Sequence, residues 1–233
     1  MNKPYIRLAD TIGNVTAWIV DGKWVRDHLD IDFTDVGQHY RFDFIPVNEI
    51  WVGHEAHPGE TNFFIEHGLV ERRLMAAGSS YDEALEEADR VEEQERVRSR
   101  EDYSLTAGQS AANFADYHKE LLATVTLGVD AARGTGVKVW LVDGARVRNE
   151  LDIDFTEGGH GYVYTFIPQD EVWIDDDIDP DERKFIILHE LHERNLMSLG
   201  LPYGKAHAEA NQVEAVARQK ESGGIRKAIG GLR

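Results

Sequence analysis

One stretch of the chain combines histidine and glutamate at a spacing that suits metal chemistry. His189, Glu190, His192 and Glu193 lie within five consecutive residues. On a helix at about 100° per residue, His189 falls near the middle of an apolar face, with Glu193 about 40° from it. The i, i+4 spacing directs both side chains to one side, as helical zinc sites with two ligands require. The pattern therefore predicts that His189 and Glu193 bind a divalent ion.

A third ligand must come from another segment, and the next predicted helix offers His207. Two imidazoles and one carboxylate, with an open position for water, make a hydrolytic zinc site. Glu190, near the edge of the apolar face, would then act as the general base. His192 is an alternative ligand or a residue that orients one, and Glu214 could reach the same point as His207.

The competing interpretation of these residues is structural. A buried carboxylate needs a partner, because removing an unpaired charge from water is costly. A His–Glu pair that is hydrogen-bonded to itself or to the strands would meet this need without a metal. Elsewhere, the glycine-rich residues around His160 favour a turn over a metal-binding loop. The acidic run 175–182 favours a solvated helix cap, because it lacks the glycine and glutamate spacing of a calcium loop.

The chain contains an internal duplication. Residues 15–98 (the first copy) align with residues 137–220 (the second copy) at a constant offset of 122, and about 38 of the 84 positions are identical. The first copy keeps the pair, as His67 and Glu71. If the second copy binds metal, the first has lost the site and remains as a scaffold; if the pair is structural, both copies use it. The differences are Gly68, Val70 and Leu85, where the second copy has Glu190, His192 and His207.

Each copy is predicted to be α+β. In the second copy, residues 137–142 read as a strand, Asp143-Gly144 as a hairpin turn and residues 145–148 as the return strand. Further strands are expected at 161–167 and 171–175, and helices at about 180–199 and 203–220. Each of the two tandem repeats is thus a small antiparallel sheet followed by two helices. We expect a first repeat at 1–100, a linking segment at 101–136 with its helix at 111–132, a second repeat at 137–233, and a loose tail from Gly223.

The composition excludes several classes of protein. The 233 residues include no cysteine, which rules out disulfides, cysteine-ligated zinc, iron–sulfur clusters and thiol nucleophiles. A net charge of −18 disfavours direct binding to nucleic acid or to an anionic membrane. No apolar run has the length of a membrane span, and the first residues lack the apolar core of a signal peptide. We predict a cytoplasmic protein, and the oligomeric state is left open.

The run that begins at Ile167-Pro168, passes through residues 171–175 and His189-Glu190-x-x-Glu193, and ends at Ala206-His207 resembles a known group. It is similar to small uncharacterised bacterial and phage proteins whose helical motif looks like that of zincin-like metallopeptidases. The resemblance covers the duplicated regions, and it departs from the usual pattern where Glu193 stands in place of the second histidine. It implies a domain type and gives no substrate.

Two hypotheses of different classes follow. In the first, the second repeat is a zinc-dependent, peptidase-like hydrolase with Glu190 as base, with His189, Glu193, His207 and His192 as candidate ligands, and with a protein or peptide as default substrate. In the second, the chain is a non-enzymatic acidic interaction protein, such as a phage or mobile-element accessory factor that binds a basic partner or mimics DNA. The His–Glu pair is then packing alone.

Overall fold

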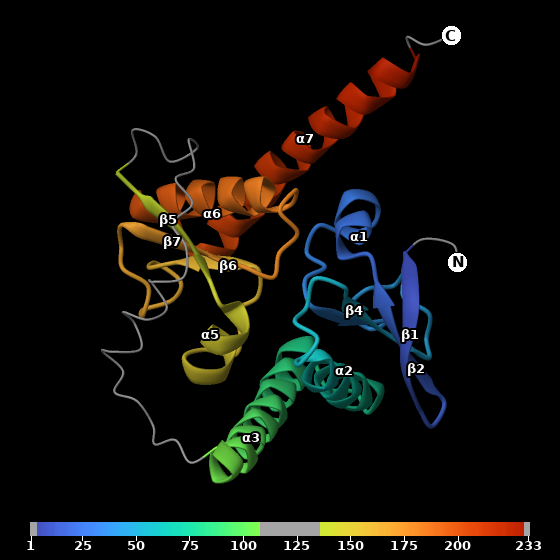
Figure 1. The fold of residues 1–233 in the computed structure, drawn as a ribbon. Coiled ribbons are helices and arrows are strands. Elements are labelled where there is room, and N and C mark those ends of the chain that lie inside the picture. The colour runs from blue at the N-terminus through green and yellow to red at the C-terminus, as the bar shows by residue number, and fades with distance from the viewer. Residues whose placement is uncertain (1–3, 108–135, 231–233) are drawn as a thin grey trace. The chain divides into compact units, whose positions relative to one another are not determined.

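The computed structural model describes the backbone of residues 4–107 and 136–230, and the side chains of residues 4–100 and 136–220. It divides into two compact units: unit 1 is Met1–Leu121 with Asp143–Thr156, and unit 2 is Leu122–Val142 with Glu157–Arg233. Within the described residues the fold class is α+β, with two small mixed sheets and six helices (Figure 1). The predicted linking helix at 111–132 lies outside the described residues.

Unit 1 holds a four-stranded sheet in the order β1-β2-β4-β3. Strand β1 is antiparallel to β2, β2 is parallel to β4, and β3 is antiparallel to β4. Helix α2 packs on β3 and β4 and on α3. The elements are β1 (Tyr5–Ile12), β2 (Val15–Val20), α1 (Gly22–His28), β3 (Val36–Gln38), β4 (Glu49–Gly53), α2 (Thr61–Ala76), α3 (Tyr81–Ala107) and α5 (Gly144–Glu150).

Unit 2 holds a three-stranded sheet in the order β5-β7-β6. Strand β5 is parallel to β7, and β6 is antiparallel to β7. Helix α6 packs on β6 and β7 through its apolar face and on α7 at its side. The elements are β5 (Lys138–Val142), β6 (Gly158–His160), β7 (Glu171–Asp175), α6 (Arg183–Ser198) and α7 (Tyr203–Gly230).

The prediction of antiparallel sheets is wrong, because the Asp-Gly pair after the first strand starts a helix instead of a hairpin. The Asp143 carboxylate accepts a hydrogen bond from the backbone N–H of Arg146 at 2.8 Å and caps α5. Asp21 caps α1 in the same way, through the N–H of Trp24 at 2.9 Å. An aspartate at an N-cap satisfies an N–H that lacks a partner within the helix. The strand that pairs with the first strand after this helix therefore runs parallel to it. The predicted return strand at 145–148 is helical.

Two further predictions for the second copy need correction. Residues 161–167 are turns, in which the N–H groups of Val163 and Tyr164 both bond to the carbonyl of His160; the strand is β6, just before them. The tail from Gly223 is not loose as predicted, because α7 continues to Gly230. The strand expected at 171–175 and the positions of the two long helices are confirmed.

The strand pairs place aligned tryptophans opposite one another in both sheets. Trp18 lies opposite Trp51 across β2 and β4, and Trp140 lies opposite Trp173 across β5 and β7. The residues that alternate with these tryptophans along the strands point to the opposite face, where they fill the space between each sheet and its helix.

Segment 143–156 lies in unit 1, although the sequence alignment places it in the second copy. Arg148 of α5 donates from Nη2 to Oε2 of Glu60 at 2.6 Å and from Nε to Oε1 at 2.9 Å. Arg96 of α3 donates to the same carboxylate at 2.6 Å, and all three side chains are buried. Breaking such a pair leaves an uncompensated buried charge, so these contacts hold the segment in unit 1.

Among the described residues, no helix has both the length and the apolar character needed to cross a membrane.

Candidate metal centre

Three ligand atoms from two helices meet in unit 2. Nε2 of His189 on α6 lies 3.2 Å from Nδ1 of His207 on α7. Oε2 of Glu193 on α6 lies 2.9 Å from that Nδ1 and 3.6 Å from Nε2 of His189. The i, i+4 spacing on α6 and the neighbouring helix thus bring together the three residues that the sequence nominated as ligands.

The size of this triangle fits a zinc ion. Ligand atoms 2.0–2.2 Å from a tetrahedral zinc ion are separated from one another by about 3.3–3.6 Å. The separation of 3.6 Å lies at the upper end of this range, and those of 3.2 and 2.9 Å lie below it. The set contains two imidazoles and one carboxylate, which leaves a fourth position, as in hydrolytic zinc sites. The side chain of His207 is 36% exposed, so that edge of the triangle faces solvent.

Close packing of α6 against α7 brings His207 to this position. Ala206 and Ala210 of α7 are fully buried and form a stripe of small side chains. Helix α6 ends at Ser198, and Gly200 follows with a φ of +91°, a left-handed conformation that favours glycine. The short turn that follows returns the chain as α7, and His207 stands about one turn after its start.

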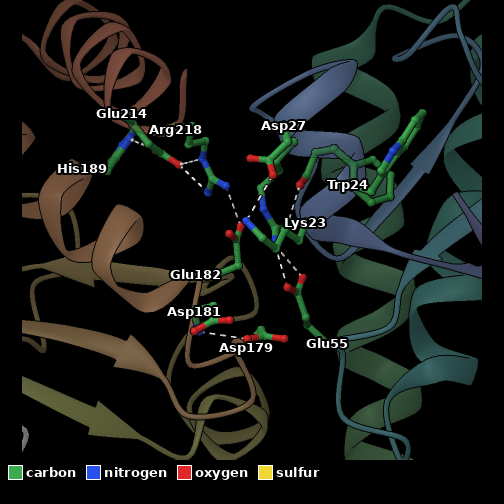
Figure 2. A network of polar contacts seen from close by, with 12 residues as sticks. Lys23, Trp24, Asp27, Glu55, Asp179, Asp181, Glu182, His189, Glu214 and Arg218 are labelled. Atoms are coloured by element: carbon green, nitrogen blue, oxygen red, sulfur yellow. Dashed lines mark hydrogen bonds and ion pairs between the residues drawn. The ribbon is translucent and has the colours of Figure 1, made fainter. Parts of the chain in front are cut away.

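The other ring nitrogen of His189 is fixed by a chain of buried charges (Figure 2). Nδ1–H of His189 donates to Oε2 of Glu214 at 3.0 Å. Oε1 of Glu214 accepts from Nε of Arg218 at 2.9 Å, and Nη1 of Arg218 donates to Glu182 at 2.7 Å. A carboxylate on the second nitrogen is the usual support of a metal-binding histidine, because it sets the ring orientation and raises its basicity. Glu214 therefore contacts His189 on the side away from the triangle and does not belong to the triangle itself.

The electrostatics of the triangle favour a cation. Burial by itself lowers the pKa of His189, but hydrogen bonds to Glu193 and Glu214 overcome it and raise the pKa to about 10. Burial raises the pKa of Glu193, yet hydrogen bonds from His160, His189 and His207 bring it far below its usual range. The site thus holds a proton tightly at neutral pH, in the place where a metal ion would sit.

Glu190 is buried without a hydrogen bond to its carboxylate among the described residues. Its residue is 9% exposed, and one of its oxygens lies within 4.8 Å of ligand atoms of His160 and Glu193. Burial raises the pKa of Glu190 to about 7, with Glu193 also raising it and nearby His189 lowering it. A carboxylate at a largely buried position is costly, and Gly68 at the aligned position of the first copy indicates that the helix itself needs no acid there.

Gly158 makes the space that Glu190 occupies. A Cβ on Gly158 would lie 3.3 Å from Cγ of Glu190 and 3.0 Å from the carbonyl oxygen of Trp173. In the first copy the two sizes are exchanged: Val36 stands at the position of Gly158, and Gly68 at that of Glu190. A Cβ on Gly68 would lie 3.3 Å from Cγ2 of Val36. Each copy therefore fills one volume between helix and strand, with a valine in unit 1 and with the Glu190 side chain in unit 2.

His160 is a site residue that the sequence analysis undervalued. The side chain is fully buried on β6, and Nε2 lies 3.0 Å from Oε1 of Glu193. Local glycines suggested a turn, and the turn does begin directly after this residue. The signal that could have identified it is the alignment, since Gln38 at the same position of the first copy is also polar and also contacts a glutamate, Glu71.

The remaining candidates stand apart from the triangle. His192 is half-buried and belongs to none of the groups of described residues whose ligand atoms come within 4.8 Å of one another. Asp175, Asp176 and Asp177 form such a group, but Asp175 is engaged as a turn residue that accepts from the N–H of Asp177 at 2.9 Å. The structure therefore brings His189, Glu193 and His207 together, places Glu190 beside Glu193 and His160, and leaves His192 outside.

Unit 1 keeps the supporting chain without the triangle. Nδ1–H of His67 donates to Glu92 at 2.9 Å, and Arg96 joins Glu92 to Glu60 with hydrogen bonds of 2.8 and 2.6 Å. Leu85 stands where unit 2 has His207, and the first copy contributes no group of three ligand atoms among the described residues. The buried His–Glu–Arg–Glu chain is thus common to both copies, whereas among the described residues the triangle of histidine and glutamate atoms occurs in the second copy alone.

No protein-family model, curated protein or solved structure matches this chain. The likeness to zincin-like motifs rests on the sequence pattern alone.

Proposed function

We propose that unit 2 binds one zinc ion through Nε2 of His189, Oε2 of Glu193 and Nδ1 of His207, and hydrolyses a peptide or protein substrate. The observation that carries this proposal is the triangle of 2.9, 3.2 and 3.6 Å between these atoms. The His–Glu–Arg–Glu chain does not carry it, because unit 1 has that chain with Leu85 in place of the third ligand.

A bound zinc ion would supply Lewis-acid polarisation of a water molecule and of the substrate carbonyl. Glu190 accepts the proton of the attacking water and passes it to the leaving amine. Its pKa of about 7 without metal falls when a cation is near, because a neighbouring positive charge favours the carboxylate form. Glu190 is then ionised at neutral pH, as a general base must be. Glu214 keeps the His189 ring in position throughout.

The chain is, in this proposal, a tandem duplication in which only the second copy is active. Support comes from the aligned sequences and from the equal strand registers in the two sheets. The exchange of Val36 and Gly68 for Gly158 and Glu190 indicates that one copy gave up packing for a buried acid, or that the other regained packing after the acid was lost. Unit 1 then serves as a scaffold.

Glu190→Gln tests the proposal. The amide keeps the shape of the side chain and removes its basicity, so folding and zinc content should stay as in the unchanged protein. Hydrolysis of a fluorogenic peptide library should fall by about 10²–10⁴-fold, the usual contribution of a general base. His192→Gln is the matched control on the same helix, and it should keep its rate. Undiminished activity of Glu190→Gln would exclude hydrolysis at this centre and favour the acidic interaction protein.

A further inference from the structure

His160 contacts the proposed metal centre through one ring nitrogen and the backbone through the other. Nε2 lies 3.0 Å from Oε1 of Glu193, and Nδ1 accepts a hydrogen bond from the backbone N–H of Tyr162 at 3.2 Å. The residue is fully buried on β6, so neither nitrogen exchanges these partners for water.

The backbone contact fixes the protonation of the ring. A backbone N–H can only donate, so Nδ1 of His160 must offer a lone pair to Tyr162. A doubly protonated ring would place Nδ1–H against that N–H, and the neutral ring must therefore carry its single proton on Nε2. That proton points at Oε1 of Glu193, and the lone pair that a metal ion would need on Nε2 is absent.

The first copy makes the same two contacts through an amide side chain, which has one fixed donor group and one fixed acceptor atom. Oε1 of Gln38 accepts from the backbone N–H of Tyr40 at 2.7 Å, and Nε2 of Gln38 donates to Oε2 of Glu71 at 3.1 Å. The opposite amide orientation would put oxygen against carboxylate and N–H against N–H. Gln38 aligns with His160, Tyr40 with Tyr162 and Glu71 with Glu193. Glutamine and histidine thus act here as interchangeable bridges from a backbone N–H to a buried glutamate.

We propose that His160 is a positioning residue, which holds Oε1 of Glu193 by an Nε2–H hydrogen bond so that Oε2 alone is presented to the metal ion. The part that concerns the ion rests on the proposed function, whereas the tautomer and the hydrogen bond do not. The proximity of His160, Glu190 and Glu193 within 4.8 Å would also suit a second ion with His160 as ligand. The proton on Nε2 argues against that arrangement.

The first test compares His160→Gln with His160→Leu. Zinc affinity is measured by competition with a chromophoric chelator. Glutamine reproduces both contacts, as in the first copy, so His160→Gln should bind zinc within about threefold of the unchanged protein. Leucine removes the donor, and loss of a residue that supports a ligand costs about 10–100-fold in affinity. An equal loss in both variants would show that the imidazole itself is a ligand and would overturn the proposal.

The second test observes the ring directly and does not need the metal. Nitrogen-15 spectra of the histidine rings in the metal-free protein should show His160 with its proton on Nε2, and the signal should persist after one equivalent of zinc. A proton on Nδ1, or loss of the Nε2 proton on adding zinc, would refute the positioning role. A protein that binds no zinc would refute the proposed function, and the tautomer of His160 would still decide this inference. The tautomer also decides it if His160→Leu does not fold.

Discussion

Gly158→Val is the substitution that most directly tests how Glu190 is accommodated. A Cβ at this position would lie 3.0 Å from the carbonyl oxygen of Trp173, 3.1 Å from Cδ1 of Ile174 and 3.3 Å from Cγ of Glu190. Comfortable contacts between non-bonded carbon atoms lie near 3.5–4.0 Å. Valine adds two methyl groups beyond Cβ, so the Glu190 side chain must leave its place or the strand must shift.

We expect Gly158→Val to destabilise unit 2 by about 2 kcal/mol, within the range of about 1–3 kcal/mol for overpacked sites. Adding Glu190→Gly recreates the pair Val36–Gly68 of unit 1. The double variant should recover about 1–2 kcal/mol relative to the sum of the single changes, a coupling typical of residues in contact. The recovery is incomplete, because the contact with the carbonyl of Trp173 stays.

Urea denaturation of the metal-free protein measures this coupling in a double-mutant cycle. The cycle cancels the cost of about 1 kcal/mol that glycine brings to a helix interior, because that cost appears in both variants that carry Glu190→Gly. Gly204→Ala serves as control, since apart from its chain neighbours and its own helix backbone nothing lies within 4 Å of a Cβ there. If the change in the free energy of unfolding of the double variant equals the sum of the changes in the two single variants, Gly158 and Glu190 do not compete for the same volume, and this account is refuted.

Two further predictions concern protons and the first copy. Zinc binding at pH 8 should release about one proton, because Glu193 and Glu214 raise the pKa of His189 to about 10 against the opposing effect of burial, and a metal must displace the proton on Nε2. The affinity for zinc should therefore rise about tenfold per pH unit up to that pKa. Calorimetry in buffers of different ionisation enthalpy counts the protons released on zinc binding. A count of zero would contradict His189 as a ligand. His67→Ala should lower the free energy of unfolding by about 2–3 kcal/mol, because it leaves buried Glu92 without its histidine partner. Its zinc content should not change. Loss of zinc from this variant in metal analysis would show that the metal site was assigned to the wrong copy.

That His189, Glu193 and His207 come together could be predicted from the sequence, because helical periodicity decides the directions of their side chains. His189 and Glu193 share a face through their i, i+4 spacing, and His207 follows on a helix that a glycine and a short turn bring back alongside. Glu190 was placed at the edge of the apolar face, yet it is buried. Its burial depends on Gly158, a residue more than 30 positions away in the sequence, and no local pattern reports such a pair.

The errors have equally specific causes. Asp143-Gly144 is as good a helix start as it is a hairpin turn, and the N-cap bond to Arg146 decides for the helix; the mixed sheet follows from that choice. His160 lies among glycines that signal a turn. Its importance emerges only when the partner on α6, Glu193, and the equivalent Gln38 are both in view.

The most direct test of the central claim is the zinc content of the full chain, purified without a histidine tag or chelator and analysed by native mass spectrometry and elemental analysis. We predict one zinc ion per chain in the unchanged protein and in His67→Ala, and none in His189→Ala. A protein that stays metal-free in excess zinc, or a His189→Ala variant that retains its ion, would contradict the assignment of the triangle in unit 2 as a metal centre.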